Sequence, residues 1–276
     1  MNPWRPGRAI RAGVVLLLAA HTLGCATALH EPPPLAEMAG TRQVLNDAGA
    51  AALQTEAEDL FHRRDLESAR AAARLQLQAG LNETARRESL VAAARILVWI
   101  TDHDPDADVR AAAAVQAVDA AIWCRRTAPR DAACDYWLGA ALGVQARERR
   151  RTGYSALPEV EAAFQRVAAA APDLDHATGE RSLAFLYLRA PGWPTGPGDP
   201  DLGLVHARAA VARYPDYPPN LLVLAEALKK TGDGEASQAT WQQAVAAARQ
   251  AMAAGDPDGP EWLADAEKGL AGPGQP

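Results

Sequence analysis

The sequence predicts an all-α protein, a solenoid of helical hairpins with long insertions between the helices of some pairs. Ala, Leu, Arg and Glu dominate the composition, Ile and Thr are scarce, and no run of residues indicates a strand. Three similar boundaries, at Pro129, Pro172 and Pro215, follow one another at intervals of 43 residues. Apolar residues between them recur at the spacing of a helix face. Such a repeat is typical of stacked helical units, each too small to bury its apolar face alone.

The first 24 residues have the layout of a secretory signal peptide. Arg5, Arg8 and Arg11 precede a short apolar run over Ala12–Ala20. A membrane-spanning helix needs about 20 apolar residues, so this run is too short to remain in the membrane as a span. We therefore expect residues 1–24 to be removed on export.

The apolar run is followed by Thr22-Leu23-Gly24-Cys25, which resembles the lipobox of bacterial lipoproteins. In that family the cysteine is acylated and becomes the first residue of the mature chain. Thr22 departs from the pattern, because the family prefers Leu at that position. The resemblance implies a lipid anchor at Cys25. In that family the residue after the cysteine directs sorting, and Ala26 in this position, in place of Asp, implies an outer-membrane protein that faces the periplasm. The alternative is cleavage after Ala26–Ala28 (Ala-Thr-Ala), which leaves no lipid.

The expected mature chain has three parts. Residues 25–40 contain Pro32–Pro34 and are predicted to form a flexible, lipid-anchored tether, since prolines keep a chain extended. Residues 41–271 form the helical repeat domain, and residues 272–276 (GPGQP) form a disordered tail.

The repeat pattern is fainter in the upstream half of the repeat domain. The clearest helix start there follows Asp65, because Asp is a favoured N-cap. Its expected helices are Gln43–His62, Leu66–Gln78, Glu83–Thr101 and Val109–Arg126.

Cys124 and Cys134 are predicted to form a disulfide across a tight turn between two helices. Export to an oxidising compartment permits the bond, and the spacing places one thiol near the end of a helix and the other near the start of the next. The alternative is two buried free thiols. A metal site is not expected, because no His or further Cys lies close to the pair.

The last repeat unit, residues 218–250, has the clearest helical hairpin. Thr231-Gly-Asp-Gly breaks it into two helices, and a further helix is expected over Pro260–Leu270. The inner faces of the two helices are predicted to carry Leu221, Leu224, Ala225 and Leu228, and Ser237, Trp241, Ala244, Val245 and Ala248.

This unit resembles the tetratricopeptide repeat, whose pattern is matched by Leu224-Ala225, Gly232, Ser237 and Trp241. Arg249 stands where the closing Pro would fall. The resemblance implies paired antiparallel helices and a concave binding surface. The two earlier units exceed the usual 34-residue period, and the excess is expected around residues 147–158 and 190–200.

The charge pattern excludes some functions. The chain carries a net charge of −6, and loss of the first segment would leave 25 basic against 34 acidic residues, so nucleic acid is not expected as a partner.

No catalytic motif occurs, and we predict no enzyme and no cofactor. The acids of Asp102–Asp108 lack the Gly and Glu of a calcium loop, so they are interpreted as a helix connector and no metal is predicted.

Two segments are candidates for contact with a partner. Arg149 and Arg150 belong to a basic run that is either a solvated helix end or a contact for an anionic ligand or lipid headgroups. Trp193 lies in the Pro- and Gly-rich segment APGWPTGPGDP, where it either anchors a partner or folds back onto the repeat core.

Residues Tyr136–Ala247 also resemble the T-component of TRAP transporters, an exported lipoprotein with cryptic tetratricopeptide repeats. The resemblance rests on WLGAALG, a Pro-Asp boundary, LAFLYLRAPGWPTGPGDPDLG and AVARYP. It implies a periplasmic solute-binding protein as partner, assembly into homo-oligomers and a cavity for apolar solute. The alternative is a protein scaffold in outer-membrane assembly or secretion, binding another envelope protein.

Overall fold

The computed structural model describes residues 30–149 and 154–272, and over these ranges the chain is helical with no strand. The expected signal peptide, residues 1–24, and Cys25 lie outside the described residues. The helices are α1 (Leu35–Met38), α2 (Asp47–Phe61), α3 (Leu66–Ala79), α4 (Arg86–His103), α5 (Ala107–Thr127), α6 (Ala132–Glu148), α8 (Leu157–Ala170), α9 (Thr178–Arg189), α10 (Pro200–Arg213), α11 (Pro218–Lys230), α12 (Gly234–Ala253) and α13 (Gly259–Ala271), with a 3₁₀ turn η1 (Tyr154–Ala156).

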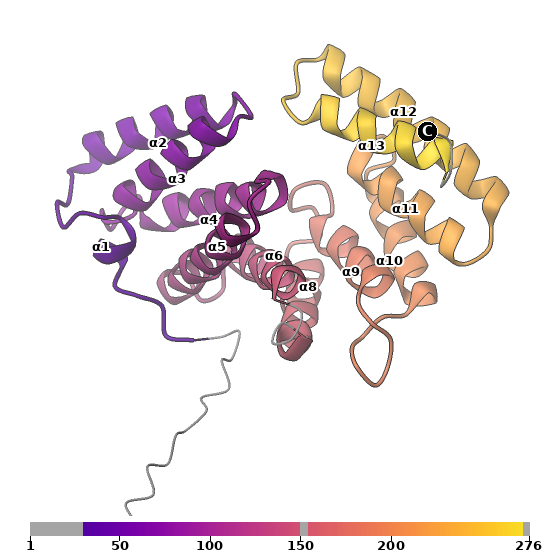
Figure 1. Cartoon of the computed structure of the whole chain (residues 1–276), viewed down its shortest axis with the longest axis horizontal. Helices are drawn as coiled ribbons and strands as arrows, with labels where there is room; N and C mark the ends of the chain where they lie inside the picture. Colours follow the sequence, from indigo (N-terminus) through magenta and orange to yellow (C-terminus); the bar gives the residue numbers. More distant parts are fainter. Residues whose placement is uncertain (1–29, 150–153, 273–276) are drawn as a thin grey trace, which may run out of the picture.

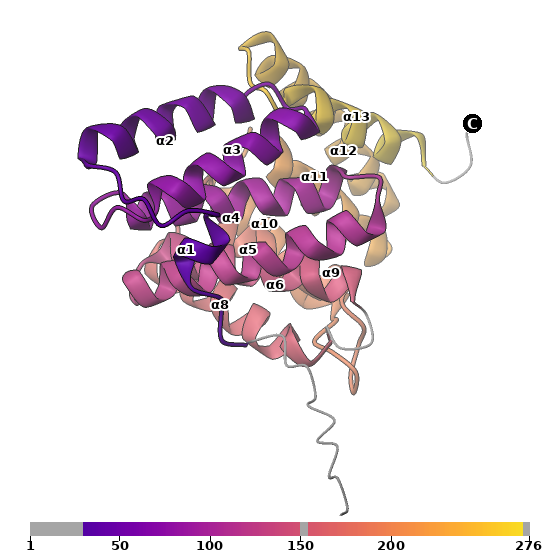
Figure 2. The same ribbon diagram turned by 60° about the vertical axis from the view of Figure 1, so that its left-hand side comes forward.

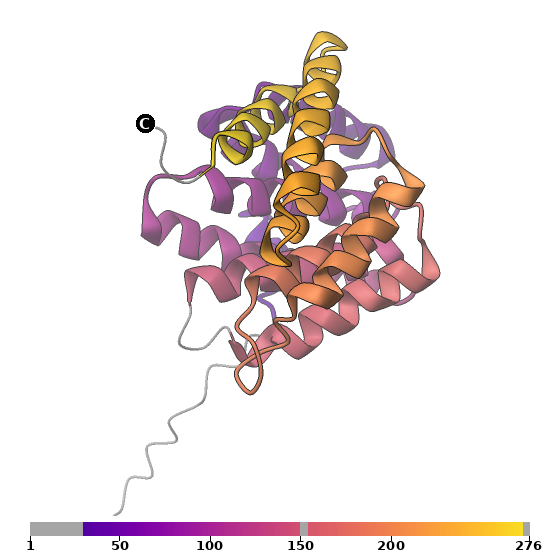
Figure 3. The same cartoon turned by 90° about the vertical axis from the view of Figure 1, so that its right-hand side faces the viewer.

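From α2 onward, each helix packs against the next, and the array bends into an arch (Figure 1). Some helices also contact the next helix but one. These pairs are α4 with α6, α9 with α11, and α11 with α13, and the contacts place these helices in an inner layer. Helices α3, α5, α8, α10 and α12 form the outer layer. Figure 3 looks at the arch from its C-terminal end, with α12 and α13 in the foreground and the N-terminal helices behind.

Helix starts follow the predicted local chemistry. The Asp65 side chain accepts a hydrogen bond from the Ser68 amide at 2.8 Å, as the sequence led us to expect. The same kind of cap begins five of the other long helices. These caps are Asn46, Asp106, Asp131, Asp199 and Asp233.

The helix predictions are confirmed apart from their ends. The expected helix from Gln43 begins instead at Asp47, because Asn46 caps it. Both long insertions also fall where the 43-residue period placed them, between α6 and α8 and between α9 and α10. What the structure shows is therefore an all-helical array of consecutively packed helices.

The part of the expected tether that the structure describes is packed against the body. Leu35 is buried in the main core, and the indole nitrogen of Trp123 on α5 donates a hydrogen bond to the Pro33 carbonyl at 2.8 Å. Glu31 pairs with Arg126 at 2.6 Å. Figure 2 shows this segment and α1 running along the stack of α3–α5. The prediction of a flexible tether over residues 25–40 is therefore wrong from His30 onward, because Trp123 and Arg126 of α5 hold the Pro33 carbonyl and Glu31, and Leu35 is buried.

Among the described residues, no helix combines the length and the apolar character that crossing a membrane requires. The main apolar core extends from Leu35 to Tyr187, and two smaller clusters serve α9–α13. Of the expected disordered tail, residues 272–276, all but Gly272 lies outside the described ranges.

Candidate binding groove

The concave side of the arch contains two adjoining cavities, which we call the aromatic cavity and the aliphatic cavity. Their volumes are about 690 Å³ and about 710 Å³. Asp102 and Tyr136 line both, so the two cavities lie side by side, and we call them together the groove. A volume of this size is in the range of sites for small molecules.

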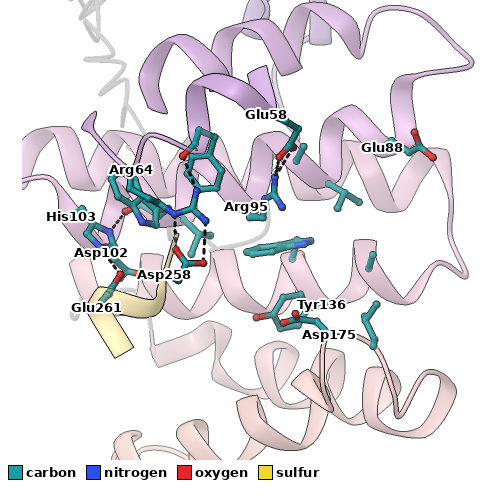
Figure 4. A pocket seen from close by; sticks show the side chains of 18 of the residues that line it. Glu58, Arg64, Glu88, Arg95, Asp102, His103, Tyr136, Asp175, Asp258 and Glu261 are labelled. Carbon is teal, nitrogen blue, oxygen red and sulfur yellow. Dashed lines mark hydrogen bonds and ion pairs between the residues drawn. The ribbon is translucent and has the colours of Figure 1, made fainter. Parts of the chain in front are cut away.

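The aromatic cavity lies between the two ends of the arch (Figure 4). Its walls come from the end of α2, from α4 and α6, and from the start of α13. Several rings contact each other here, with Phe61 edge-on to Trp99 at 5.8 Å and Tyr217 edge-on to Trp262 at 5.5 Å. The aromatic residues that line it are Phe61, Trp99, Tyr136, Trp137, Tyr217 and Trp262.

Two polar contacts join the ends of the arch across this cavity. Arg64 donates from Nε to Asp258 Oδ1 at 2.5 Å and from Nη2 to Oδ2 at 3.0 Å, although 194 residues separate them. His103 Nε2 lies 3.2 Å from the Glu261 carboxylate. Figure 4 shows both contacts at the rim. We call these two contacts the clasp.

Arg64 and His103 are held in place by their own elements. Arg64 follows α2 with a positive φ of 54°, and its guanidinium lies 4.1 Å above the Phe61 ring. His103 stacks on Trp99 one turn earlier in α4, and its Nδ1 lies 2.8 Å from the Trp99 carbonyl oxygen. A carbonyl oxygen only accepts, so Nδ1 carries a proton, and the carboxylate favours a proton on Nε2 as well. The hydrogen bond to Glu261 accordingly raises the pKa of His103 above its ordinary value.

Cations that line the groove are paired with carboxylates. Arg95 pairs with Glu58 at 2.5 Å, and Arg147 pairs with Asp102 at 2.7 Å. Arg87 makes a two-pronged contact with Asp131, with a closest distance of 2.8 Å. The groove therefore presents aromatic faces and neutralised ion pairs to a ligand.

The aliphatic cavity lies between α6 and α9 of the inner layer, which are packed less closely than α4 and α6. The floor of the cavity is apolar and is formed by Val160 and Phe164 of the outer helix α8, both of which are buried. Walls are formed by Val144 of α6 and Phe185 of α9. Gly143 of α6 also faces open space, since nothing lies within 4 Å of a Cβ built there.

A buried polar cluster shapes the wall of the groove between α8 and α11. Asp175, His176 and Ala177 have positive φ angles of 41°, 55° and 65°, a conformation unfavourable for side-chain-bearing residues. Arg181, itself buried, donates to the carbonyls of Asp175 and His176 at 3.2 Å. The fully buried Asn220 accepts from the same guanidinium at 3.0 Å. This cluster places Asp175 in the groove.

The predicted contact residues lie away from the groove, and Arg150 lies outside the described residues. Arg149 is the C-cap of α6. Trp193 is 90% exposed, so the alternative that it folds back onto the repeat core is wrong. Trp193 belongs to the connection between α9 and α10, and backbone hydrogen bonds within this connection close its base and leave Trp193 outside the core.

Cys124 and Cys134 confirm the predicted pairing. Their sulfur atoms are 1.95 Å apart, both residues are fully buried, and they lie in the last turn of α5 and the first turn of α6.

The acids of Asp102–Asp108 serve the α4–α5 connection. Asp106 caps α5 and Asp104 pairs with Arg70. Within the described ranges, no group of three or more ligating side chains is arranged to hold a metal ion.

Sequence reasoning missed the groove residues. Trp99 and His103 are spaced i, i+4, which was a visible sign of a shared helix face. No local signal connects Arg64 with Asp258, because that contact depends on how far the whole array bends.

Comparison with known proteins adds no assignment: no family model matches the chain, and no curated protein matches its sequence.

Proposed function

We propose that this chain is a non-enzymatic binding module of the bacterial envelope, whose concave groove holds an apolar ligand. In this proposal Cys25 carries the lipid that anchors the chain to the outer membrane, facing the periplasm. The module serves TRAP-type solute uptake, with a periplasmic solute-binding protein as partner. One observation carries the proposal, the aliphatic cavity of about 710 Å³ that lies beside the aromatic cavity.

The character of the groove supports binding rather than catalysis. A reaction requires an acid, base or nucleophile with a defined task. Here the cations of Arg95 and Arg147 are held by carboxylates of the same groove. Aromatic and aliphatic walls instead fit a ligand that is recognised through apolar contact.

A dye titration tests the groove. The probe is 1-anilinonaphthalene-8-sulfonate, whose fluorescence rises in apolar surroundings. The Gly143→Trp variant places a large side chain in the open space beside α6, and we expect at least tenfold weaker dye binding. Gly143→Ala is the matched control and should bind as the natural chain does. Equal binding by both variants would place the dye, and the proposed site, elsewhere.

The anchor has a separate test. We expect Cys25→Ala to move the protein from the membrane fraction to the soluble fraction, because acyl chains supply the anchoring free energy. Unchanged partitioning would contradict lipidation at Cys25.

The second candidate is a scaffold in outer-membrane assembly or secretion. It is favoured by the position of the two cavities side by side along the inner helix layer, since a concave helical surface of this kind also fits an extended peptide. A mild-detergent pull-down from native membranes, followed by mass spectrometry, separates the two. Recovery of a solute-binding protein supports the uptake role, whereas outer-membrane or secretion components support the scaffold. Recovery of differently tagged copies of the chain tests the homo-oligomer that the resemblance implies.

A further inference from the structure

We propose that the end of the molecule formed by the α9–α10 connection lies on the lipid bilayer, with Trp193 inserted among the headgroups. The inference rests on the anchor at Cys25 proposed above. It adds an orientation, and it assigns a lipid surface as the partner of the most exposed large apolar side chain among the described residues.

The anchor is short because the chain that follows it is fixed to the body. His30 Nε2 lies 2.7 Å from the buried Asp119 carboxylate, and Glu31 and Pro33 contact Arg126 and Trp123 as described above. Only residues 26–29 separate Cys25 from His30. The five steps from one Cα to the next between Cys25 and His30 span at most about 18 Å when fully extended. An acylated Cys25 therefore keeps the bilayer within a short distance of the place where residue 30 meets the body.

The α9–α10 connection lies at the same end of the molecule. In Figures 1 and 2, which differ by rotation about the vertical axis, the indigo start of the described chain and this connection both lie at the lower edge of the body. Because such a rotation preserves height, the two lie on the same, lower side of the body. A bilayer close to residue 30 is therefore also close to the connection.

The connection is built to hold its tip outward. Its base is closed by hydrogen bonds from the Gly198 amide to the Pro191 carbonyl and from the Asp199 amide to the Tyr187 carbonyl, both 2.9 Å. A Cβ at Gly198 would collide with the Ala190 carbonyl oxygen, so the two strands of the loop approach as closely as backbones can. The ordered tip nevertheless leaves Trp193 90% exposed.

An indole suits the boundary between headgroups and acyl chains, because its ring is apolar and its N–H is polar. Exposed apolar side chains follow Trp193 in the first turns of α10. Leu202 is 43% exposed and Val205 59% exposed, and they lie three residues apart on one helix face. The partner that fits this surface is a lipid bilayer, because the anchor close to residue 30 holds the bilayer near the α9–α10 connection.

Fluorescence quenching by brominated lipid tests the orientation. The acylated chain is reconstituted into phosphatidylcholine–phosphatidylglycerol vesicles whose acyl chains carry bromine close to the glycerol backbone. The spectrum of Trp193→Phe is subtracted from that of the natural chain, which isolates the emission of Trp193. We expect bromine to reduce this difference signal at least twofold. The difference signal from Trp262→Phe, a residue of the groove, should not change.

The outcomes separate the surface from the anchor. The intact mass of the mature chain reports acylation of Cys25. If the mass shows no acyl chain, the proposed anchor fails. A chain produced to begin at Cys25 is then coupled through this cysteine to a maleimide lipid, because the other two cysteines are in the disulfide. Quenching of Trp193 in either anchored form supports the orientation. An unquenched Trp193 overturns it, and loss of a protein partner from the pull-down of Trp193→Ala would then identify the loop as a protein contact. Trp193→Ala should melt at the temperature of the natural chain, since its side chain is exposed.

Discussion

Asn220 shows how a single buried amide fixes the junction of several elements. Its side-chain nitrogen donates to the carbonyls of His176, Ala210 and Tyr214 at 3.1 to 3.3 Å, and its oxygen accepts from Arg181. The side chain of Asn220 is fully buried, so its own amide has no water as an alternative partner. The left-handed backbone at His176 is held in this way.

We expect Asn220→Ala to lower the free energy of unfolding by about 2–4 kcal/mol, because it removes four hydrogen bonds that a fully buried side chain makes at once. Urea denaturation followed by circular dichroism measures the change. The matched control is Asp173→Ala, which breaks an exposed contact with Arg213 and should cost less than about 1 kcal/mol. Equal costs for the two variants would show that the cluster is not a source of stability.

The disulfide is the second prediction at this scale. Replacing Cys124 and Cys134 together by Ser should lower the free energy of unfolding by about 2–3 kcal/mol, since the bond closes a short loop. Reduction of the natural chain should raise its intact mass by two hydrogen atoms. Titration of these two thiols without reductant would contradict the bond.

At the scale of the element, the spacing between neighbouring helices depends on small residues. Helix α6 carries two glycines with opposite surroundings. A Cβ on Gly139 would lie 2.7 Å from the ring of Phe164 on α8, whereas one on Gly143 would meet nothing within 4 Å. The first glycine permits close packing, and the second leaves space in the groove.

The two glycines predict opposite effects of the same substitution. Gly139→Ala should destabilise the protein by about 1–3 kcal/mol, because the buried Phe164 ring must move. Gly143→Ala should stabilise it by up to about 1 kcal/mol, because Ala is the better helix former. Thermal and urea unfolding of both variants measure the effects. Destabilisation by Gly143→Ala would show that the cavity beside α6 is filled.

At the scale of the whole molecule, the clasp closes the arch over the aromatic cavity. Repeat arrays have contacts mainly between neighbours, and their ends are usually far apart. Here Arg64, which follows α2, and His103 at the end of α4 contact the start of α13, so the two ends of the arch restrain each other. The openness of the groove therefore depends on contacts at its rim.

The clasp predicts a dependence of stability on pH. Because Glu261 raises the folded-state pKa of His103, the contact contributes in full below about pH 6.5, the ordinary value, and is lost as pH rises through the raised value. Glu261→Gln should therefore lower the free energy of unfolding by more at pH 6 than at pH 8.5. Urea unfolding of the natural chain and of the variant at the two pH values measures this difference.

The control for this dependence is Glu267→Gln, which removes a contact with Arg249, a residue that does not titrate in this range. Its effect should be the same at both pH values. A Glu261→Gln effect that is equally independent of pH would show that His103 does not act through the clasp.

The sequence by itself determined the features that depend on neighbouring residues. Helix periodicity, the Asp65 cap and the breaks around Pro129, Pro172 and Pro215 are local properties, so their positions could be predicted within a few residues. The Cys124–Cys134 pairing was predictable for the same reason, because a short turn brings the two thiols together. Helix ends were less certain, since competing caps such as Asn46 decide them.

Only the tertiary structure decided where the array bends, what its groove contains and what the N-terminal segment contacts. A small rotation between each pair of helices accumulates along the array, and the sequence shows which face is apolar without giving that angle. The contact of Arg64 with Asp258 and the two cavities follow from the accumulated bend. The packing of Pro33 on Trp123 and the exposure of Trp193 likewise depend on which surfaces meet after the helices have stacked.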